Sequence, residues 1–438
     1  MRRITRTLVT LAAAAVGAGI AVPAFAGMFD RAEPAATLAD TPGSGQSVID
    51  WNRQLISILG TPNAQPATVH PTRSFAMLQA AEYDAVVSIT HAAPPYRSAV
   101  HAPGDARPDA AADQAAHDVL VALYPPMRAG LDAQLSGELA AMPDGQAKQD
   151  GVGVGAAAAH QLIAVRSSDG SSAAAPPFVP GTRPGDYRQT PPKFPAPMYT
   201  GWGSVTPFLL GDAQQFRPAP PPPVSSATYA TALNEVKSLG RDSSTTRTTD
   251  ETVAGKFWSA TPVWNTWNQV TQQLTANRHA SLTQATSAFS ALDLSLADTT
   301  IALYDAKYHY NIWRPVTAIQ LGATAGNPSI VGDPMWNPLT PTAADPSYAG
   351  AHSALSVAAA TALTAFYGPQ QAVTITSAAA PGVTRSFTSL SGAADEAGLS
   401  RIWSGQHTRL DHQAGQQLGR QVADVVLGDL SVHQPNAS

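Results

Sequence analysis

A change of pattern along the chain constrains the fold most strongly. Apolar residues recur at three- and four-residue intervals from about residue 48 to 165 and again after about residue 229, as they do in amphipathic helices. Between these regions, residues 167–226 are dense in Pro, Gly and Ser and lack the periodicity. The sequence shows neither β-type alternation nor an internal repeat. It therefore predicts an all-α protein with a long Pro-rich irregular segment. One stripe expected in its core is Phe75, Leu78, Ala81 and Ala85.

The irregular segment at 167–226 carries aromatic residues that a solvated linker would not need. These residues are Phe178, Phe194, Tyr199, Trp202, Phe208 and Phe216. We expect them to anchor the segment, so that it wraps over the helices in an ordered way.

The first residues have the pattern of a secretory signal. Three arginines precede an apolar run at 8–22, and Ala24-Phe25-Ala26 provides small residues at the expected cleavage site. We predict a signal peptide at 1–26, a flexible leader at 27–46, an ordered region at 47–438 and a secreted or extracytoplasmic protein. A retained N-terminal anchor is the alternative. No later stretch reaches about 18 uninterrupted apolar residues, so no membrane insertion is expected after cleavage.

Composition narrows the chemistry. The chain has no cysteine, which excludes disulfides, thiolate nucleophiles and cysteine-ligated metals. Removing the three signal arginines leaves 23 basic residues against 31 acidic ones, a formal charge of −8. With this charge and no basic tract, a nucleic-acid partner is not expected.

The first of three candidate site segments runs from Lys307 to Pro315. Lys307 and Arg314 are seven residues apart, and seven steps of about 100° return to the same face of a helix. Pro315 is expected to end that helix just after Arg314. The two cations can bind an anion together, or they can be separate solvated charges on an exposed face.

The second segment is Gly350-Ala351-His352, which precedes the strong helix former Ser353–Leu363. The turn is expected at a helix N-terminus, where free N–H groups and the helix dipole attract anions. His352 would stand beside such an anion as a proton donor or acceptor. A histidine that only caps or packs is the alternative.

The third segment contains Arg401, His407 and Asp411. His407 and Asp411 are four residues apart on a predicted helix, so the carboxylate can orient the imidazole. A break at Ser404-Gly405 would place Arg401 on an incoming loop and His407 in the first helical turn. An anion there would meet Arg401, the helix N-terminus and His407. A purely structural His–Asp pair is the alternative.

Together the segments resemble the signature of the vanadium-dependent haloperoxidase and type 2 phosphatidic acid phosphatase superfamily. That signature is Lys, six residues, Arg-Pro; then Pro-Ser-Gly-His; then Ser-Arg, five residues, His, three residues, Asp. The first and third elements match at every defining position. Resemblance to the bacterial haloperoxidase branch extends over most of the chain, for example through 76–85 and 313–319.

The resemblance implies an all-α fold with two four-helix-bundle-like units, the catalytic one at 300–430. It implies a vanadate cofactor, in whose site phosphate can also bind, and hydrogen peroxide and halide as reactants. The implied roles are neutralisation of the oxyanion by Lys307, Arg314 and Arg401, N–H contacts from Gly350 and Ala351, a bond from His407 to vanadium, acid–base chemistry by His352, and orientation of a site histidine by Asp411.

The second segment departs from the signature. Ala349-Gly350-Ala351-His352 replaces Pro-Ser-Gly-His, so the serine hydroxyl is missing. The loss of one donor weakens anion binding by about 1 to 3 kcal/mol if nothing replaces it. Backbone N–H groups at Gly350 and Ala351 are expected to serve instead.

Three hypotheses follow for the function. The first is an exported vanadate-dependent haloperoxidase. The second is a secreted acid phosphatase, in which His407 attacks the phosphorus of a phosphoester and His352 protonates the leaving group. The third is a non-catalytic anion-binding relative, suggested by the altered second segment.

Overall fold

The computed structural model describes residues 44–97 and 99–431. In this part the regular secondary structure is helical apart from one short β-hairpin, which confirms the all-α prediction. Helix α1 begins at Gln46, one residue before the predicted start of the ordered region. The predicted signal peptide, and the predicted leader up to residue 43, lie outside the described residues. The proposed domain boundaries therefore stay predictions.

Five helices precede the irregular segment: α1 (Gln46–Leu59), α2 (Pro71–Thr90), α3 (Pro108–Leu123), α4 (Arg128–Ala140) and α5 (Gln146–Arg166), with a 3₁₀ turn at Pro125–Met127. Helices α2, α3 and α5 pack against one another, and α2 also packs along α9 (Leu282–Tyr310). The predicted stripe of Phe75, Leu78, Ala81 and Ala85 is completely buried on α2, so the prediction of a core face is confirmed. Its alanines let the neighbouring helices approach closely.

Residues 167–226 form the connection between α5 and α6 (Ala227–Leu239), and their one described helical element is a 3₁₀ turn at Trp202–Ser204. Two carboxylates of α9 hold this segment. Asp298 accepts backbone N–H groups of residues 208–210 at 2.6–2.9 Å, and Asp305 pairs with Arg217 at 2.7 and 2.8 Å. Trp202 and Phe208 are buried as expected. Phe194 is 57% exposed, so its prediction as an anchor is wrong.

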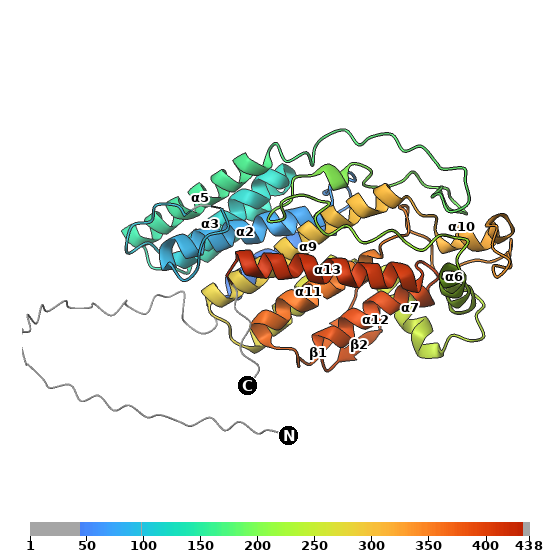
Figure 1. Cartoon of the computed structure of the whole chain (residues 1–438). Coiled ribbons are helices and arrows are strands. Elements are labelled where there is room, and N and C mark those ends of the chain that lie inside the picture. Colours follow the sequence, from blue (N-terminus) through green and yellow to red (C-terminus); the bar gives the residue numbers. More distant parts are fainter. Residues whose placement is uncertain (1–43, 98, 432–438) are drawn as a thin grey trace, which may run out of the picture. The chain divides into compact units, whose positions relative to one another are not determined.

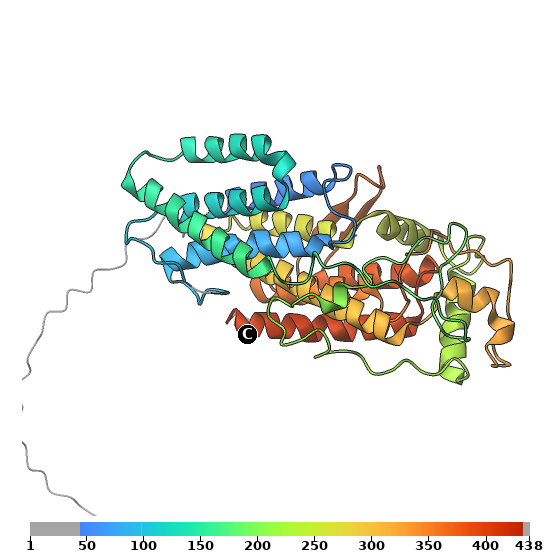
Figure 2. The ribbon, with the colours of Figure 1, turned by 90° about the horizontal axis from the view of Figure 1, so that it is seen from above.

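The helices after the irregular segment form a second group: α6, α7 (Thr249–Ala260), α8 (Val263–Asn277), α9, α10 (Pro315–Gln320), α11 (Ala351–Tyr367), α12 (Leu390–Trp403) and α13 (Arg409–Asp429), with a 3₁₀ turn at Gly322–Thr324. Helix α11 packs against α9, α12 and α13 (Figure 1). Figure 2 shows the blue-to-green helices of the first group and the orange-to-red helices of the second gathered at different ends. Because α9 packs against α2, α11 and α13, it joins both groups.

Helix α9 does not continue to Arg314, so the prediction that one helix carries Lys307 and Arg314 is wrong. The helix ends at Tyr310 because Asn311 adopts the left-handed conformation, with φ of 51°. The chain then runs extended to Arg314, which is the N-cap of α10, and Pro315 starts α10. Proline is well suited to the first position of a helix, where its missing N–H leaves no hydrogen bond unmade.

The hairpin was not predicted from the sequence. Strands β1 (Val373–Thr376) and β2 (Thr384–Phe387) pair in antiparallel register. Val373 and Ile375 are buried and the threonines between them are exposed, which is the alternation of a half-buried strand. The strand is too short for this alternation to stand out in the sequence. Among the described residues, no helix combines the length and the apolar character needed to cross a membrane.

Candidate active site

The fold brings all three predicted segments together inside the second group of helices. Lys307 lies in the last turn of α9, Arg314 at the start of α10 and Arg401 in the last turn of α12. His407 lies just before α13. All four side chains are buried, although they carry three cations. We call Lys307, Arg314, Arg401 and His407 the cradle.

Arg314 fixes the protonation of His407. Its Nη1 atom lies 3.2 Å from His407 Nε2 and donates to the Gln406 carbonyl at 3.0 Å. A guanidinium can only donate, so His407 Nε2 must accept and the ring proton must lie on Nδ1. Burial, followed by the charges of Arg314 and Lys307, lowers the pKa of His407 well below its ordinary value. His407 is therefore a neutral imidazole whose Nε2 lone pair faces the cradle.

Asp411 lies on the other side of the His407 ring, as the spacing predicted. Its Oδ2 atom is 3.5 Å from His407 Nδ1 and accepts the Ser347 hydroxyl at 2.8 Å and the Thr408 N–H at 2.7 Å. Burial raises the pKa of Asp411, and the bonds from Thr408 and Ser347 act against this shift. The carboxylate thus orients the imidazole while neutral donors hold it in place.

The local structure around His407 differs from the prediction in one respect. Thr408 is the N-cap of α13 and forms a capping box with Asp411, so His407 precedes the helix instead of occupying its first turn. Arg401 belongs to α12 and is not on a loop. The predicted break is present: Gly405 has φ of 80°, and an added Cβ would lie 2.7 Å from the Gly240 carbonyl oxygen. Only glycine suits this turn.

Arg401 carries an unsatisfied donor. Its Nη1 atom donates to Ser259 Oγ at 2.6 Å, but its buried Nε has no hydrogen-bond partner among the described residues. Burial, followed by the charge of Arg314, lowers the pKa of Arg401 to about 9, so the guanidinium stays charged at neutral pH. A buried cation with an unpaired donor is unfavourable unless an anion completes it.

The sequence analysis missed Asp345, which contacts the other two cations. Its Oδ1 atom is 3.0 Å from Lys307 Nζ and also accepts Arg314 Nη2, while its carbonyl accepts Arg314 Nε at 2.7 Å. Lys307 Nζ also donates to the Pro346 carbonyl at 2.5 Å. Burial lowers the pKa of Lys307 to about 8 against the opposing effect of Asp345. The only signal in the sequence is the position of Asp345 just before the second segment.

The second segment lies at the N-terminus of α11, as predicted, with Gly350 as the N-cap. The Gly350 N–H donates to the Asp411 carbonyl at 2.8 Å, so it cannot contact an anion, and that expectation is wrong. Ala351 N–H remains a candidate donor. A serine at 350 would be crowded, because an added Cβ would lie 3.1 Å from the Asp411 carbonyl oxygen. Helix α11 therefore approaches α13 closely at the point where the signature serine is missing.

His352 is half-buried and its Nε2 lies 2.9 Å from the Trp258 carbonyl oxygen. A carbonyl only accepts, so Nε2 carries a proton. Burial, followed by the charge of Arg401, lowers the pKa of His352 to about 3. The neutral ring therefore leaves its Nδ1 lone pair available as a proton acceptor.

The two serines near the missing one have other partners. Ser347 Oγ bonds Asp411 and lies 3.4 Å from His407 Nδ1, whereas Ser353 Oγ lies 2.9 Å from His412 Nδ1. Ser347 thus supports the His407–Asp411 pair. Neither serine replaces the signature hydroxyl by a contact seen in the structure.

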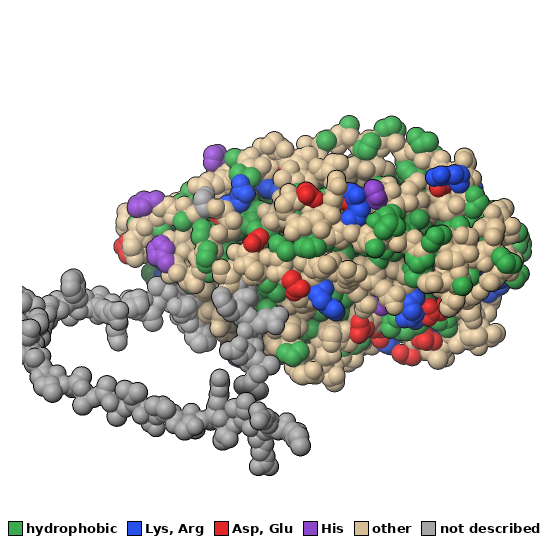
Figure 3. Space-filling view, in the orientation of Figure 1, with side chains coloured by type: hydrophobic (Ala, Val, Ile, Leu, Met, Phe, Trp, Pro, Cys, Tyr) green, Lys and Arg blue, Asp and Glu red, His purple; other side chains and the backbone are tan. Residues whose placement is uncertain are grey.

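The donor set of the cradle suits a tetrahedral oxyanion such as vanadate. It offers three buried cations, an unpaired guanidinium N–H and one imidazole lone pair, while no group of three or more His, Asp or Glu among the described residues is arranged to hold a bare metal cation. Fixed cations and N–H donors stabilise oxygen-rich anions. On the face drawn in Figure 3, charged side chains are sparse and scattered. The three buried cations of the cradle, by contrast, are gathered in one place.

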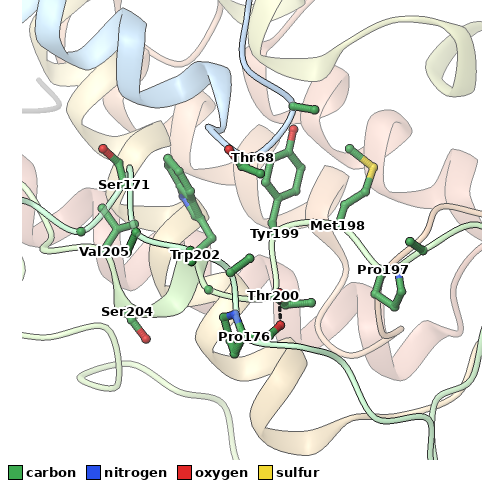
Figure 4. Close-up of a pocket in the computed structure, with 17 residues that line it drawn as sticks. Thr68, Ser171, Pro176, Pro197, Met198, Tyr199, Thr200, Trp202, Ser204 and Val205 are labelled. Carbon is green, nitrogen blue, oxygen red and sulfur yellow. Dashed lines mark hydrogen bonds between the residues drawn. The ribbon is translucent and has the colours of Figure 1, made fainter.

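A hollow of about 420 Å³ is lined mainly by the irregular segment. Figure 4 shows Tyr199 and Trp202 on its wall, beside Met198. The Tyr199 ring lies 5.1 Å from the Tyr304 ring, and the Tyr304 hydroxyl is 3.4 Å from Asp345 Oδ2. Tyr199 and Tyr304 therefore lie between this hollow and Asp345.

Comparison with known proteins identifies the fold. Residues 287–434, which contain the whole cradle, match the family model of the VCPO second helical-bundle domain. A bacterial vanadium-dependent iodoperoxidase structure matches with 24% identity and a TM-score of 0.76, covering 91% of this chain and 99% of that one. No curated protein matches the chain.

A bacterial vanadium-dependent chloroperoxidase matches in both its holo and apo forms. The holo form has 16% identity and a TM-score of 0.65, with 91% of this chain and 94% of that one covered. The apo form has 16% identity and a TM-score of 0.63, with 84% and 95% covered. At these identities the matches show a shared fold.

Proposed function

Because the chain has the fold of the bacterial vanadium-dependent haloperoxidases and residues 287–434 match the VCPO second helical-bundle domain, we propose that it is a vanadate-dependent haloperoxidase that oxidises halide with hydrogen peroxide. One observation carries the proposal: the unpaired Arg401 Nε and the His407 Nε2 lone pair belong to the same buried cationic cradle. An oxyanion that accepts from Arg401 would satisfy its Nε, and vanadium would bond His407 Nε2 in place of the contact from Arg314.

In this proposal each residue of the site has a separate role. Lys307, Arg314 and Arg401 would neutralise the oxygens of vanadate, and His407 Nε2 would supply the bond to vanadium. When bound, vanadate supplies an electrophilic centre that activates hydrogen peroxide toward halide. Asp411 keeps the His407 proton on Nδ1 so that Nε2 stays available. The neutral His352 accepts a proton from incoming peroxide at Nδ1.

The proposal is tested by halide oxidation after reconstitution with orthovanadate. The full chain, mixed with hydrogen peroxide and iodide, bromide or chloride at acidic and neutral pH, is expected to oxidise at least one halide. His407→Ala should lose this activity, whereas His309→Ala, which changes an exposed histidine of α9, should retain it. No oxidation of any halide would contradict the proposal. Vanadate-inhibited phosphoester hydrolysis in its place would favour the phosphatase alternative.

We also propose that the protein is exported, on the strength of the N-terminal arginines and the apolar run that follows them. Mass spectrometry of the protein recovered outside the cytoplasm should give a mature chain beginning near Gly27. An intact N-terminus at Met1 would contradict export by cleavage.

A further inference from the structure

Asp345 is an acidic side chain that lies against two cations of the cradle. It is 7% exposed, and its Oδ1 atom contacts both Lys307 Nζ and Arg314 Nη2. Burial would raise the pKa of Asp345, but the charges of Lys307 and Arg314 outweigh burial and hold it below its ordinary value. The carboxylate is therefore ionised across the working pH range.

The position of Asp345 relative to the reacting histidine is set by Arg314. One terminal nitrogen of this guanidinium, Nη2, contacts the Asp345 carboxylate, and the other, Nη1, contacts His407 Nε2. The Asp345 carboxylate and His407 Nε2, the atom expected to bond vanadium, thus contact the two terminal nitrogens of the same guanidinium. At this separation in a buried site, the interaction between charges is strong.

The two buried carboxylates of the site behave differently. Asp411 is held by a hydroxyl and a backbone N–H and faces the imidazole, with no cation within ion-pair distance in the described structure. Asp345 directly pairs with two of the three cradle cations, whereas Arg401 has no carboxylate partner. The cradle is therefore partly neutralised from within, on the Lys307 and Arg314 side only.

We propose that Asp345 is a built-in counter-ion that sets the oxyanion affinity of the cradle. It stabilises Lys307 and Arg314 when no anion is present, and it repels the anion that these same cations attract. The inference rests on the proposed use of the cradle as an oxyanion site, and it holds for vanadate and phosphate alike. Asp345 acts through Lys307 and Arg314, so it is a positioning and affinity-setting residue.

The sign of the effect separates this role from a structural one. If Asp345 only held Lys307 and Arg314 in place, its neutralisation would loosen them and weaken anion binding. If it competes electrostatically, Asp345→Asn leaves the side-chain shape nearly unchanged, removes the repulsion and tightens binding. A tighter complex cannot result from a disordered site.

The experiment is calorimetric titration of the full chain with inorganic phosphate and, separately, with orthovanadate, without any activity assay. Asp345→Asn is expected to lower the dissociation constant about tenfold or more for both anions. The control is Asp305→Asn, which removes the charge of a carboxylate on α9 that pairs with Arg217 outside the cradle, and it should leave the dissociation constant unchanged. An unchanged or higher dissociation constant for a folded Asp345→Asn protein overturns the inference.

A second pair of variants decides the question if Asp345→Asn does not fold. Asp345→Glu and Asp345→Gln have the same size and differ only in charge, so the Gln variant should bind phosphate more tightly than the Glu variant. Equal binding overturns the inference. Tight phosphate binding without any halide oxidation would contradict the proposed haloperoxidase and leave the counter-ion role standing. If neither anion binds to any variant, both proposals fail.

Discussion

Each helical group buries a cluster of titratable side chains, one acidic and the other mainly cationic. Beside the first, Glu82 of α2, Asp113 of α3 and Asp293 of the joining helix α9 are completely buried, and each has at least one carboxyl oxygen with no hydrogen-bond partner among the described residues. In the second, the cradle buries Lys307, Arg314 and Arg401, with Asp345 pairing two of them and Asp411 facing His407. Both interiors break the rule that buried charges are compensated.

The difference lies in how each interior can become neutral. Burial, with Asp113 and Asp293 nearby, raises the pKa of Glu82 well above its ordinary value, and burial raises that of Asp113 to about 7. A carboxyl group escapes its charge by binding a proton, but a guanidinium does not lose its proton at physiological pH. The acidic cluster can thus become neutral by holding protons, whereas the cationic cluster can become neutral only when an anion binds. This difference supports the proposal that the cradle binds an anion.

The largest effect is expected from Arg401→Met, which removes the unpaired cation. Oxyanion affinity should fall about a hundredfold or more, because a buried charge partner is lost. The anion-free protein should become more stable by about 1–3 kcal/mol, since an uncompensated buried charge is replaced by an apolar chain. Calorimetric titration and chemical denaturation measure the two changes.

Arg420→Met, at an exposed position on α13, is the matched control and should change neither quantity. If Arg401→Met destabilises the anion-free protein, the charge is already compensated within the fold. The contrast between the two interiors would then be lost.

Asp411→Asn tests whether the Asp411 carboxylate orients the His407 imidazole. Without the charge facing Nδ1, the ring is oriented less firmly and becomes a weaker ligand, and activity and vanadate affinity should fall about 10- to 100-fold. Steady-state kinetics after reconstitution checks this expectation, with Asp424→Asn on the exposed side of α13 as the control. Equal activity of the two variants would show that Asp411 only caps the helix.

Glu82→Gln tests the acidic interior through pH. The folded state holds the Glu82 proton more tightly than the unfolded state, so this proton's contribution to stability is complete below the ordinary pKa of 4.5 and is lost as pH rises toward the folded value. Above about pH 5, the wild type should lose stability relative to Glu82→Gln by up to about 1.4 kcal/mol per pH unit. Urea denaturation at several pH values measures this difference. Parallel curves would mean that Glu82 is not buried as an isolated acid.

The smallest effect is expected where the second segment departs from its signature. Gly350→Ser adds a Cβ 3.1 Å from the Asp411 carbonyl oxygen, and the neighbouring backbone must shift slightly. We expect a loss of about 1 kcal/mol in the free energy of unfolding, measured by denaturation. A more stable Gly350→Ser protein would show that α11 and α13 have room for the missing serine.

Local residue chemistry allowed part of the site to be predicted. The turn before α11 and the break at Ser404-Gly405 follow from helix propensity and glycine, and the His407–Asp411 pairing follows from spacing. The end of α9 could not be predicted in this way, because it depends on Asn311 adopting a left-handed conformation that asparagine only occasionally takes.

Contacts between distant segments could not be predicted in this way. The pairing of Asp345 with Lys307, and the bond from Gly350 N–H to the Asp411 carbonyl, arise where α9, α11 and α13 meet. Neither leaves a periodic or compositional signal in the sequence. The resemblance to a known superfamily predicted that the three segments meet. The structure added the pairing of Asp345 with Lys307 and Arg314 inside the cradle.

The most direct test of the cradle is a crystal structure of the full chain grown with orthovanadate. The account predicts one vanadate per chain, bonded to His407 Nε2 and accepting a hydrogen bond from Arg401 Nε. Vanadate bound at another place, or a cradle in which Arg401 Nε keeps no partner while vanadate is present in excess, would contradict it.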